Sequence, residues 1–513
     1  MSTVTATVPV LSAAEASARD AATIAAGVPS RALMQRAGAA AAAEIARRHA
    51  DRLAAGALVL AGPGNNGGDA WVVARALAAA GVRCVVHEPV EARTDDARAE
   101  RALALPCVER SADPRAAAGV VVDGLLGIGA TGAPRGPIAA AIDAAADARA
   151  RGALVVALDV PSGVDASTGA AEHAVTADLT LTFGALKRGL LVARGRCGRI
   201  VVLDVGFLPE GDDGSAAPRL ADDRWALAHV PPIAADAHKG TRRKLLVVGG
   251  ANGMAGAAAL AARAALASGI GMVRVAAESR SVPVLQTTVP AALAAGWPDD
   301  DEELEALCAW ADALLVGPGL GRTDDARALL DGALARWRGP VLLDADALTL
   351  FADRVERLAE LLAGRPALLT PHPLEFARLA GLPLAEVLER RWDVGVEFAR
   401  RLGATVLLKG VPTIVSSPDG RRLVSAAGNP ALAAGGSGDL LSGIAATLLA
   451  QTGDAPVAAA CAAWAHGRAA ELATTGGARG VTVDDVARAV GRVWDEPSRT
   501  APYPVLVELP PVP

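Results

Sequence analysis

Short apolar runs of three to six residues, each followed by a glycine-rich turn or a helical stretch, recur along most of this chain. Continuous apolar runs of this length are typical of strands buried on both faces. Strands that alternate with helices form a mostly parallel sheet with helices on both sides, so the pattern predicts an α/β fold. The expected strands are residues 57–61, 83–86, 119–122, 153–158, 179–183, 199–203, 244–248, 272–276, 313–316, 341–343, 367–369, 405–408 and 413–415.

One segment interrupts this alternation. Residues 208–237 are rich in Pro, Gly and Asp, a composition typical of linkers, and 513 residues are too many for one ordinary core. We therefore expect a Rossmann-like three-layer domain over residues 1–215 and a second α/β domain over residues 225–498. The last fifteen residues contain five prolines, which predicts an extended tail over residues 499–513.

Composition limits the class of protein. The formal net charge of −6 is mild and gives no reason to expect a nucleic-acid partner. No apolar run of about 18 residues is free of charges and turn residues, so we expect no membrane partner. Residues 1–10 lack the charge pattern of a secretory signal, and the five cysteines lie far apart, which indicates a reducing compartment. These features favour a cytoplasmic enzyme, which we expect to be a homo-oligomer.

Lysine and asparagine are rare in this chain. Only four of its 50 basic residues are lysines, and it has only four asparagines. Where arginine is the common choice, a retained lysine suggests a place that needs a compact ammonium. Seven of the eight lie in or beside glycine-rich segments. The eight residues are Lys187, Lys239, Lys244, Lys409, Asn65, Asn66, Asn252 and Asn429.

The segment Gly-Pro-Gly-Asn-Asn-Gly-Gly-Asp at residues 62–69 follows a predicted strand and precedes a helix expected over residues 70–80. Glycine lets backbone N–H groups approach an anion closely, and a helix N-terminus favours negative charge. A tight turn would need only the glycines. The adjacent Asn65 and Asn66 therefore favour a binding loop.

A second segment, residues 122–132, contains a Gly-x-Gly-x-x-Gly string. A dinucleotide-binding fingerprint needs a helix that starts inside the string, and Pro134 and Pro137 delay that helix. We therefore expect a loop around a phosphate or pyrophosphate, and no hydride-transfer site.

Asp159 lies at the end of a third predicted strand, in Asp-Val-Pro-Ser-Gly. Ligands of open α/β sheets bind at this edge, so Asp159 is either a site carboxylate or a turn cap, and we favour the first. Lys187 is a second candidate for a site residue. Since the neighbouring Arg188 shows that arginine occurs in this segment, the lysine suggests a place that needs an ammonium. Asn66, Asp123 and Ser162 supply hard oxygens from three strand ends, which suits a monovalent or divalent cation.

The second half contains Gly-Gly-Ser-Gly-Asp at residues 435–439, ahead of a long apolar helix. The backbone N–H groups of this turn can form an anion hole for a phosphoryl group in transfer. Asp439 at its rim can accept the proton of an attacking hydroxyl. An Asp-capped helix would explain Asp439 but not the small residues before it.

Other segments of this half suit the same chemistry. Lys409 precedes the turn Gly410-Val411-Pro412-Thr413 and is apt to hold a nucleotide phosphate or ribose. His372 stands beside prolines and Glu375 after a predicted strand. Gly-rich turns follow two further strands, at residues 249–257 and 317–321.

Residues 30–208 resemble the epimerase domain of the NAD(P)HX repair enzymes, through the three strings in the first half. The resemblance implies epimerisation of hydrated NAD(P)H at the carbon that bears the hydroxyl. It implies Asp159 in the substrate site as the acid–base group, and Asn66, Asp123 and Ser162 as K⁺ ligands; we count Lys187 with Asp159 as catalytic. The implied ligand contacts are Asn65, Asn66, Gly67, Gly68, Asp69, Gly127, Ile128, Gly129, Ala130, Thr131, Gly132 and Ala133.

Residues 235–495 are similar to the dehydratase domain of the same repair system, which has a ribokinase-like fold. The resemblance implies that ADP phosphorylates the hydrate's hydroxyl, giving AMP, and that phosphate then leaves to restore NADH or NADPH, with Mg²⁺ bridging the ADP phosphates. Asp439 would act at the hydroxyl. The implied contacts with hydrated cofactor are Ala257, Gly319, Gly321 and His372, and those with the nucleotide are Lys409, Gly410, Val411, Pro412, Thr413 and Gly438.

Two departures from the family pattern are visible. Thr241 follows His-Lys-Gly where a second glycine is usual, and Ala291 follows Pro290 where an acidic residue is common. Two alternatives stay open at this point. One is a small-molecule kinase of the hydroxymethylpyrimidine or ribokinase type with a ligand-binding accessory domain. The other is a nucleotide-binding regulatory protein without activity.

Overall fold

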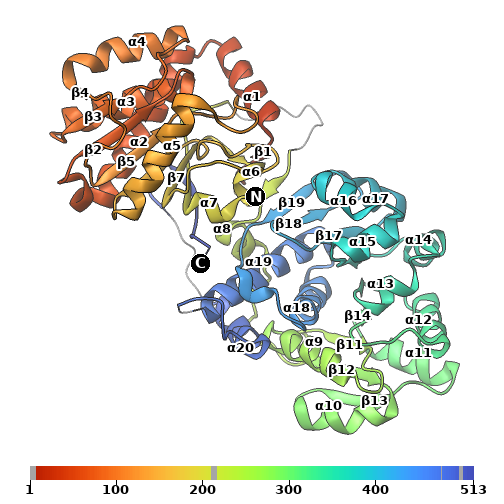
Figure 1. The fold of residues 1–513 in the computed structure, drawn as a ribbon. Coiled ribbons are helices and arrows are strands. Elements are labelled where there is room, and N and C mark those ends of the chain that lie inside the picture. The colour runs from red at the N-terminus through yellow and green to blue at the C-terminus, as the bar shows by residue number, and fades with distance from the viewer. Residues whose placement is uncertain (1–6, 209–216, 475, 496–500, 513) are drawn as a thin grey trace. The chain divides into compact units, whose positions relative to one another are not determined.

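The computed structural model describes residues 7–208, 217–474, 476–495 and 501–512. Contacts divide the chain into two compact units (Figure 1). The N-terminal unit contains Val8 to residue 208 and also the C-terminal residues 501–512, whereas the C-terminal unit runs from residue 217 to residue 495. The expected boundary lies between residues 215 and 225, in the segment 208–237 that the sequence predicts as a linker. Residues 209–216 lie outside the described residues, whereas β10 (Arg219–Leu220) and α8 (Asp223–His229) belong to the C-terminal unit, so this part of the segment is not a linker.

The N-terminal unit is built on a sheet with the order β20-β9-β7-β6-β5-β2-β3-β4. All neighbours pair in parallel except β20, which is antiparallel to β9. A small parallel pair, β1 (Val10–Leu11) with β8 (Leu186–Lys187), lies apart from it. The strands are β2 (Ala57–Ala61), β3 (Cys84–His87), β4 (Glu109–Arg110), β5 (Val120–Gly124), β6 (Leu154–Leu158), β7 (Leu179–Phe183), β9 (Arg199–Leu203) and β20 (Val505–Leu509).

Two apolar clusters cover this sheet. Alternate strand residues point to opposite faces, so Val59 packs with α2 and α3 on one face while Leu58 and Leu60 pack with α5 on the other. This gives the three layers that the sequence predicts. The helices are α1 (Ala13–Ala25), α2 (Ser30–Leu53), α3 (Asn65–Ala79), α4 (Asp95–Ala104), α5 (Gly136–Ala150), α6 (Arg188–Val192) and α7 (Arg194–Cys197).

The C-terminal unit contains the sheet β10-β19-β18-β17-β16-β15-β14-β11-β12-β13. Only the pairs β17–β18 and β18–β19 are antiparallel. The strands are β10 (Arg219–Leu220), β11 (Lys244–Val248), β12 (Met272–Ala277), β13 (Leu293–Gly296), β14 (Ala313–Val316), β15 (Val341–Leu343), β16 (Ala367–Leu369), β17 (Thr405–Leu408), β18 (Thr413–Ser416) and β19 (Arg422–Ser425).

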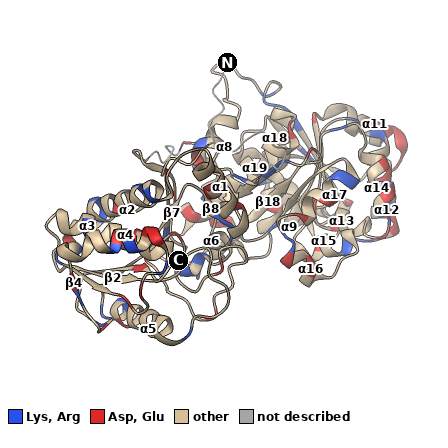
Figure 2. Cartoon of the chain, turned by 90° about the horizontal axis from the view of Figure 1, so that it is seen from above, with Lys and Arg blue, Asp and Glu red and all other residues tan. Residues whose placement is uncertain are grey.

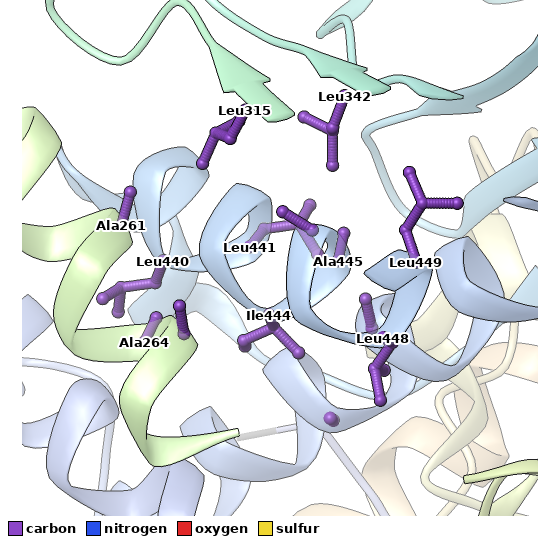
Figure 3. Close-up of a cluster of buried hydrophobic side chains, with 14 of the residues drawn as sticks. Ala261, Ala264, Leu315, Leu342, Leu440, Leu441, Ile444, Ala445, Leu448 and Leu449 are labelled. Carbon is purple, nitrogen blue, oxygen red and sulfur yellow. The ribbon is translucent and has the colours of Figure 1, made fainter. Parts of the chain in front are cut away.

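Helices cover both faces of this sheet as well. On one face α18 packs against α9 and against strand residues such as Leu315 and Leu342 (Figure 3). The other face packs against α11, α12, α14, α15 and α17. The helices are α8 (Asp223–His229), α9 (Ala255–Ala267), α10 (Val282–Thr288), α11 (Asp301–Trp310), α12 (Asp324–Arg336), α13 (Asp346–Leu350), α14 (Val355–Leu362), α15 (Pro373–Ala380), α16 (Leu384–Glu389), α17 (Val394–Leu402), α18 (Ser437–Thr452), α19 (Ala455–Ala473) and α20 (Val483–Val493).

Two local expectations need correction. The helix expected from Ala70 begins at Asn65, so the Asn-Asn-Gly-Gly segment is its first turn and not a loop before it. The end of the chain is extended, but part of it is the edge strand β20 and not a free tail, because its backbone finds partners on β9. The delayed helix α5 begins at Gly136, as Pro134 and Pro137 predict.

Charged side chains of both signs are interspersed on surface helices such as α4, as Figure 2 shows. Within the described part of the chain, no helix is both long and apolar enough to cross a membrane.

Candidate active sites

The N-terminal candidate site lies where the neighbouring parallel strands β2, β5 and β6 end. The backbones approach very closely here. A Cβ atom on Gly62 would lie 1.8 Å from the Leu125 oxygen, and one on Gly67 would lie 1.9 Å from the Gly62 oxygen. Gly64 caps α3 without any side-chain hydrogen bond, so N–H groups of the first turn are available to a ligand.

A cavity of about 560 Å³ opens at this edge of the sheet. This volume is typical of small-molecule and cofactor sites. Helices α1 and α2 complete its walls, through residues such as Asp20 and Met34. The predicted site residues that line it are Asn65, Asn66, Asp69, Gly127, Ile128, Gly129, Ala130, Asp159 and Lys187.

The remaining predicted contacts of this unit do not line the cavity. Gly67 and Gly68 are buried in the first turn of α3, and a Cβ atom on Gly68 would lie 2.5 Å from the sulfur of Met34. These glycines allow close packing behind the cavity wall. Residues 131–133, which are Thr131, Gly132 and Ala133, are exposed and lie beyond the cavity.

Asp159 and Lys187 form an ion pair at the cavity. Asp159 has a φ angle of 62°, which is rare for a residue with a side chain and marks a position held in place by its surroundings. Its Oδ1 accepts hydrogen bonds from the Lys187 ammonium, from Thr182 Oγ1 at 3.2 Å and from the Phe183 N–H at 3.2 Å. Among the described residues its Oδ2 has no such donor, so this oxygen is available to a ligand.

Asn66, Asp123 and Ser162 come together behind the cavity. Ser162 Oγ donates to Asp123 Oδ1 at 2.6 Å, and both Ser162 Oγ and Asn66 Nδ2 contact the Leu126 carbonyl oxygen. Asn66 Oδ1 is buried without a hydrogen-bond partner. Burial raises the pKa of the Asp123 carboxyl to about 6, against hydrogen bonds from Ser162 and Leu125 that lower it. A buried carboxylate beside an unsatisfied amide oxygen is a suitable environment for a cation.

Two further carboxyl groups face the cavity, from α1 and α3. Burial raises the pKa of Asp20, and the Asp159 charge adds to this effect while Lys187 opposes it. Burial also places the pKa of Asp69 well above its ordinary value, with contributions from Asp159 and Asp20. The cavity therefore contains three carboxyl groups close to the Lys187 ammonium.

The C-terminal candidate site is at the carboxyl edge of parallel strands β11, β14, β15, β16 and β17. Gly436 has a φ angle of 88° and caps α18, whose first residues are Ser437, Gly438 and Asp439. The left-handed conformation needs glycine here. The turn thus presents the free N–H groups of a helix N-terminus, which is an anion site.

Lys409 lies directly beside this turn. A Cβ atom on Gly438 would be 3.3 Å from Lys409 Nζ. Lys409 Nζ donates to Asp344 Oδ1 at 3.0 Å and lies 3.8 Å from Glu375 Oε2. Burial by itself lowers the pKa of this ammonium, but the two carboxylates outweigh it and raise the pKa. Lys409 is therefore a fixed positive charge next to the anion site.

The pKa of the Asp439 carboxyl group is strongly raised. Burial, and then the negative charge of Asp344, raise its pKa to about 7, while Lys409 opposes the shift. A carboxyl group with a pKa near neutrality can both accept and release a proton during turnover. Ser437 Oγ lies 3.2 Å from Nε2 of the buried His466, whose pKa is lowered to about 4 by burial and then by the Lys409 charge.

Ala257, Gly319 and Gly321 meet at one side of this edge. A Cβ atom on Gly319 would be 3.2 Å from the Ala257 Cβ atom. The Gly321 N–H donates to Asp346 Oδ2 at 3.0 Å, so the glycine loop after β14 is fixed by the residue that begins α13.

His372 is the N-cap of α15. Its Nδ1 accepts from the N–H groups of Leu374 and Glu375, at 3.2 and 3.3 Å, so the hydrogen is on Nε2 if the ring is neutral. Burial lowers the pKa of this imidazole. The ring thus has a structural role, and its Nε2 lies 3.5 Å from Glu375 Oε1.

The turn from Gly410 to Thr413 joins β17 to β18 at the same edge. Val411 is exposed there, and Thr413 Oγ1 donates to the Gly410 oxygen at 3.1 Å. Lys409 is anchored through its N–H, which donates to the Pro371 oxygen at 2.9 Å.

The sequence analysis missed several residues that the fold brings to these sites. Asp344 and Asp346 follow the buried strand β15 directly, and acidic residues at that position were a usable signal. Asp20 and His466 had none, because each lies within a helix without a glycine-rich turn or a strand end beside it.

Each unit thus combines an α/β sheet with glycine-rich and charged groups at its carboxyl edge. The fold and the sites define an α/β protein of two units, each with a glycine-rich turn that can bind an anion at the carboxyl edge of its sheet. A family model described as "NAD(P)H-hydrate dehydratase" matches residues 245–492, and one described as "YjeF-related protein N-terminus" matches residues 30–189.

Curated relatives resemble nearly the whole chain. The bifunctional NAD(P)H-hydrate repair enzyme Nnr of Escherichia coli (strain K12) is 36% identical over 474 residues, which is 87% of this chain and 88% of that protein. The protein of the same name from Salinibacter ruber is 37% identical, over 90% of this chain and 91% of that protein. The chain belongs to the family of bifunctional NAD(P)H-hydrate repair enzymes.

A solved structure resembles the C-terminal half. The ADP/ATP-dependent NAD(P)H-hydrate dehydratase from Bacillus subtilis, co-crystallised with ATP and Mg²⁺, is 31% identical with a TM-score of 0.48. The match covers 54% of this chain and 98% of that one.

Proposed function

We propose that this chain repairs hydrated NAD(P)H with two activities. The N-terminal unit interconverts the R and S epimers of NADHX and NADPHX. The C-terminal unit dehydrates the S epimer at the expense of ADP, releasing AMP and phosphate. The observation that carries the proposal is the arrangement at the start of α18, where Gly438 lies against Lys409 Nζ and Asp439 stands beside it.

Epimerisation is assigned to the cavity of the N-terminal unit. Asn65, Asn66, Asp69 and the segment 127–130 would contact the hydrated cofactor, and Gly67, Gly68 and residues 131–133 would shape the walls and entrance. Asp159 would give a proton to the hydroxyl group when the bond between carbon and oxygen breaks, and would take a proton back when that bond forms again. Lys187 would keep Asp159 in place.

A K⁺ ion is proposed behind this cavity. Asn66, Asp123 and Ser162 fit the ion because the Asn66 Oδ1 is buried without a partner and Asp123 is a buried carboxylate. When bound, K⁺ would offset the buried negative charge and fix the loops that carry these residues.

Dehydration is assigned to the edge of the C-terminal sheet. Ala257, Gly319, Gly321 and the Nε2 side of His372 would contact the hydrated cofactor, and Lys409, the turn 410–413 and Gly438 would hold the nucleotide. Asp439 would take the proton of the substrate hydroxyl group while the oxygen of that hydroxyl attacks the terminal phosphorus of ADP. The N–H groups at the start of α18 would stabilise the charge on the transferred phosphoryl group.

Mg²⁺ would enter with ADP and would neutralise part of the charge on its phosphates. The carboxylates of Asp344 and Glu375 provide hard oxygens at this edge that suit the water ligands of such an ion. We also propose a cytoplasmic location, supported by five unpaired cysteines, and a homo-oligomeric state that sedimentation would measure.

A kinase of the hydroxymethylpyrimidine type would use the same turn at Gly438. It would leave the cavity with Asp159 and Lys187 without a role, so the repair function accounts for more of the molecule. Purified protein given both epimers of NADHX with ADP should restore the absorbance of reduced nicotinamide completely. Recovery of only one epimer would contradict the epimerase assignment, and phosphorylation of a pyrimidine alcohol without recovery would favour the kinase.

A further inference from the structure

Helix α1 carries one acidic side chain into the cavity of the N-terminal unit. Ala16, Asp20 and Ile24 recur at helical spacing on the face of α1 that lines this cavity. The helix is held by a capping box between Ser12 and Glu15. The position of Asp20 is therefore fixed by a regular helix and not by a flexible loop.

Asp20 makes no hydrogen bond and no ion pair with any described residue, although it is partly buried. The carboxylate of Asp96, which lines the same cavity, is by contrast hydrogen-bonded to Ser30 Oγ at 2.5 Å. An unpaired carboxyl group in a partly buried position costs stability, and such a cost is typical of groups that act on a ligand.

The charged groups around Asp20 come from several elements. They are Asp159 after β6, Lys187 on β8, Asp69 on α3 and Arg19 on its own helix. The single ammonium of Lys187 pairs with Asp159, and the Arg19 guanidinium donates to the Gly184 and Leu208 oxygens. Burial, and then the negative charge of Asp159, raise the pKa of both Asp20 and Asp69, while Lys187 opposes the shift. Both carboxyl groups therefore keep their protons to a higher pH than an exposed aspartate does.

A single acid–base group cannot easily catalyse epimerisation, because it would have to act on both faces of the ring. The hydroxyl of the two epimers points to opposite faces of the ring, while the ring itself is held in one orientation. A group on a second wall of the cavity would serve the other face. Asp159 lies at the sheet edge and Asp20 on α1, which are different walls of the cavity.

We propose that Asp20 is a second catalytic acid–base residue of the epimerase site, acting from α1 while Asp159 acts from the sheet. This rests on the proposed epimerase function. The Asp20 carboxyl group gives its proton to the hydroxyl oxygen as the carbon–oxygen bond breaks, so that water leaves with the bonding pair. The lone pair of the adjacent ring nitrogen forms a carbon–nitrogen double bond. Water then adds to the other face and gives its proton to Asp159, and the reverse reaction uses the two carboxyl groups in exchanged roles.

Asp69 is a weaker candidate for this role. It lies in the first turn of α3, among the residues assigned to contact with the ligand, whereas Asp20 has no such assignment.

The test uses the full chain and one epimer of NADHX without ADP, so that only epimer exchange is measured, by chromatography that separates the epimers. Asp20→Asn should lower kcat for exchange by about 100-fold or more, with little change in KM. The wild-type exchange rate should fall as the pH rises through the raised pKa of Asp20, because the acid then loses its proton, and this limb should be absent in the variant. Formate should partly restore exchange in Asp20→Ala, because it can enter the space of the missing carboxyl group.

Asp95→Asn is the matched control, since it removes an exposed carboxylate from the start of α4 that does not line the cavity. Its exchange rate should stay close to wild type. ADP-dependent recovery of the S epimer should be unchanged in the Asp20 variants, and the thermal transition of the N-terminal unit should not fall, because the unpaired carboxyl group contributes no stability.

Exchange at the wild-type rate in Asp20→Asn would overturn the proposed role of Asp20 but not the proposed epimerase function. A loss of rate with the pH limb retained and without rescue by formate would also overturn that role, in favour of a structural one. If the wild-type protein exchanged no epimers, the proposed epimerase function itself would fail.

Discussion

Single side chains at both sites depend on neighbours that are distant in sequence. Lys409 is held by Asp344, which is 65 positions away, and Asp159 by Lys187, which is 28 positions away. In each case a buried or half-buried charge is stabilised by an opposite charge at hydrogen-bond distance. The titration of Asp439 follows from the same principle, because its closest charged neighbours are Asp344 and Lys409.

Asp439→Asn should abolish ADP-dependent dehydration and leave epimer exchange intact. The amide cannot accept the hydroxyl proton, so kcat should fall by roughly 10²–10⁴-fold. Recovery of the nicotinamide absorbance measures the loss, and epimer chromatography without ADP is the control. Dehydration at the wild-type rate would show that Asp439 is not the base.

The pH dependence of dehydration should reflect Asp439. As a base it must be ionised, so kcat/KM should rise with pH through about 7, the value to which burial and Asp344 raise its pKa. In Asp344→Asn one negative neighbour is lost, the pKa falls, and the limb should move to lower pH. A limb at the same pH in both proteins would contradict the assignment.

At the scale of elements, the close approach of backbones decides which glycines are essential. The first turn of α3 lies against the loop after β2. Helix α18 lies against α9, where a Cβ atom on Gly443 would be 2.1 Å from the Ala261 oxygen. Glycine at such positions is a packing requirement, whereas Gly64 faces open space.

Gly67→Ala should therefore disrupt the N-terminal site, because the new Cβ atom would lie 1.9 Å from the Gly62 oxygen. The overpacking should cost on the order of 1–3 kcal/mol and displace Asn65 and Asn66, with a loss of epimer exchange. Gly64→Ala is the matched control, since no atom lies within 4 Å of its Cβ position. Chemical denaturation and the exchange assay would compare them, and equal behaviour of the two variants would contradict the packing argument.

The strand β20 should stabilise the N-terminal unit and not the C-terminal unit. It pairs with β9, and Glu508 accepts hydrogen bonds from Arg48 and Arg199. A chain that ends at residue 498 should lose epimer exchange at a lower temperature than the full chain. Dehydration should persist to the same temperature in both, and a parallel loss of the two activities would argue against this division.

At the scale of the whole molecule, two candidate sites occur on one chain, at the carboxyl edges of two separate sheets. Because each unit has its own sheet and its own candidate site, we expect each unit to take its substrate from solution. One chain with both activities can clear both epimers.

Asp159→Asn and Asp439→Asn proteins should therefore complement each other when mixed. The first would dehydrate and the second would exchange epimers, and the mixture should recover all of the added NADHX. The rate should match that of the wild type at equal site concentration. Failure of the mixture, with each variant retaining its one activity, would indicate direct transfer within one chain.

The sequence by itself determined the α/β class, the positions of most strands and the glycine-rich turns, because apolar runs and turn chemistry are local properties. It also indicated Asp159, Lys187, Lys409 and Asp439, through rare lysines and carboxylates at strand ends. Only the tertiary structure brought Asp20 to the cavity, Asp344 to Lys409 and β20 to β9. These contacts join segments far apart in the chain, and no local pattern specifies which distant partner a helix residue or an edge strand will meet.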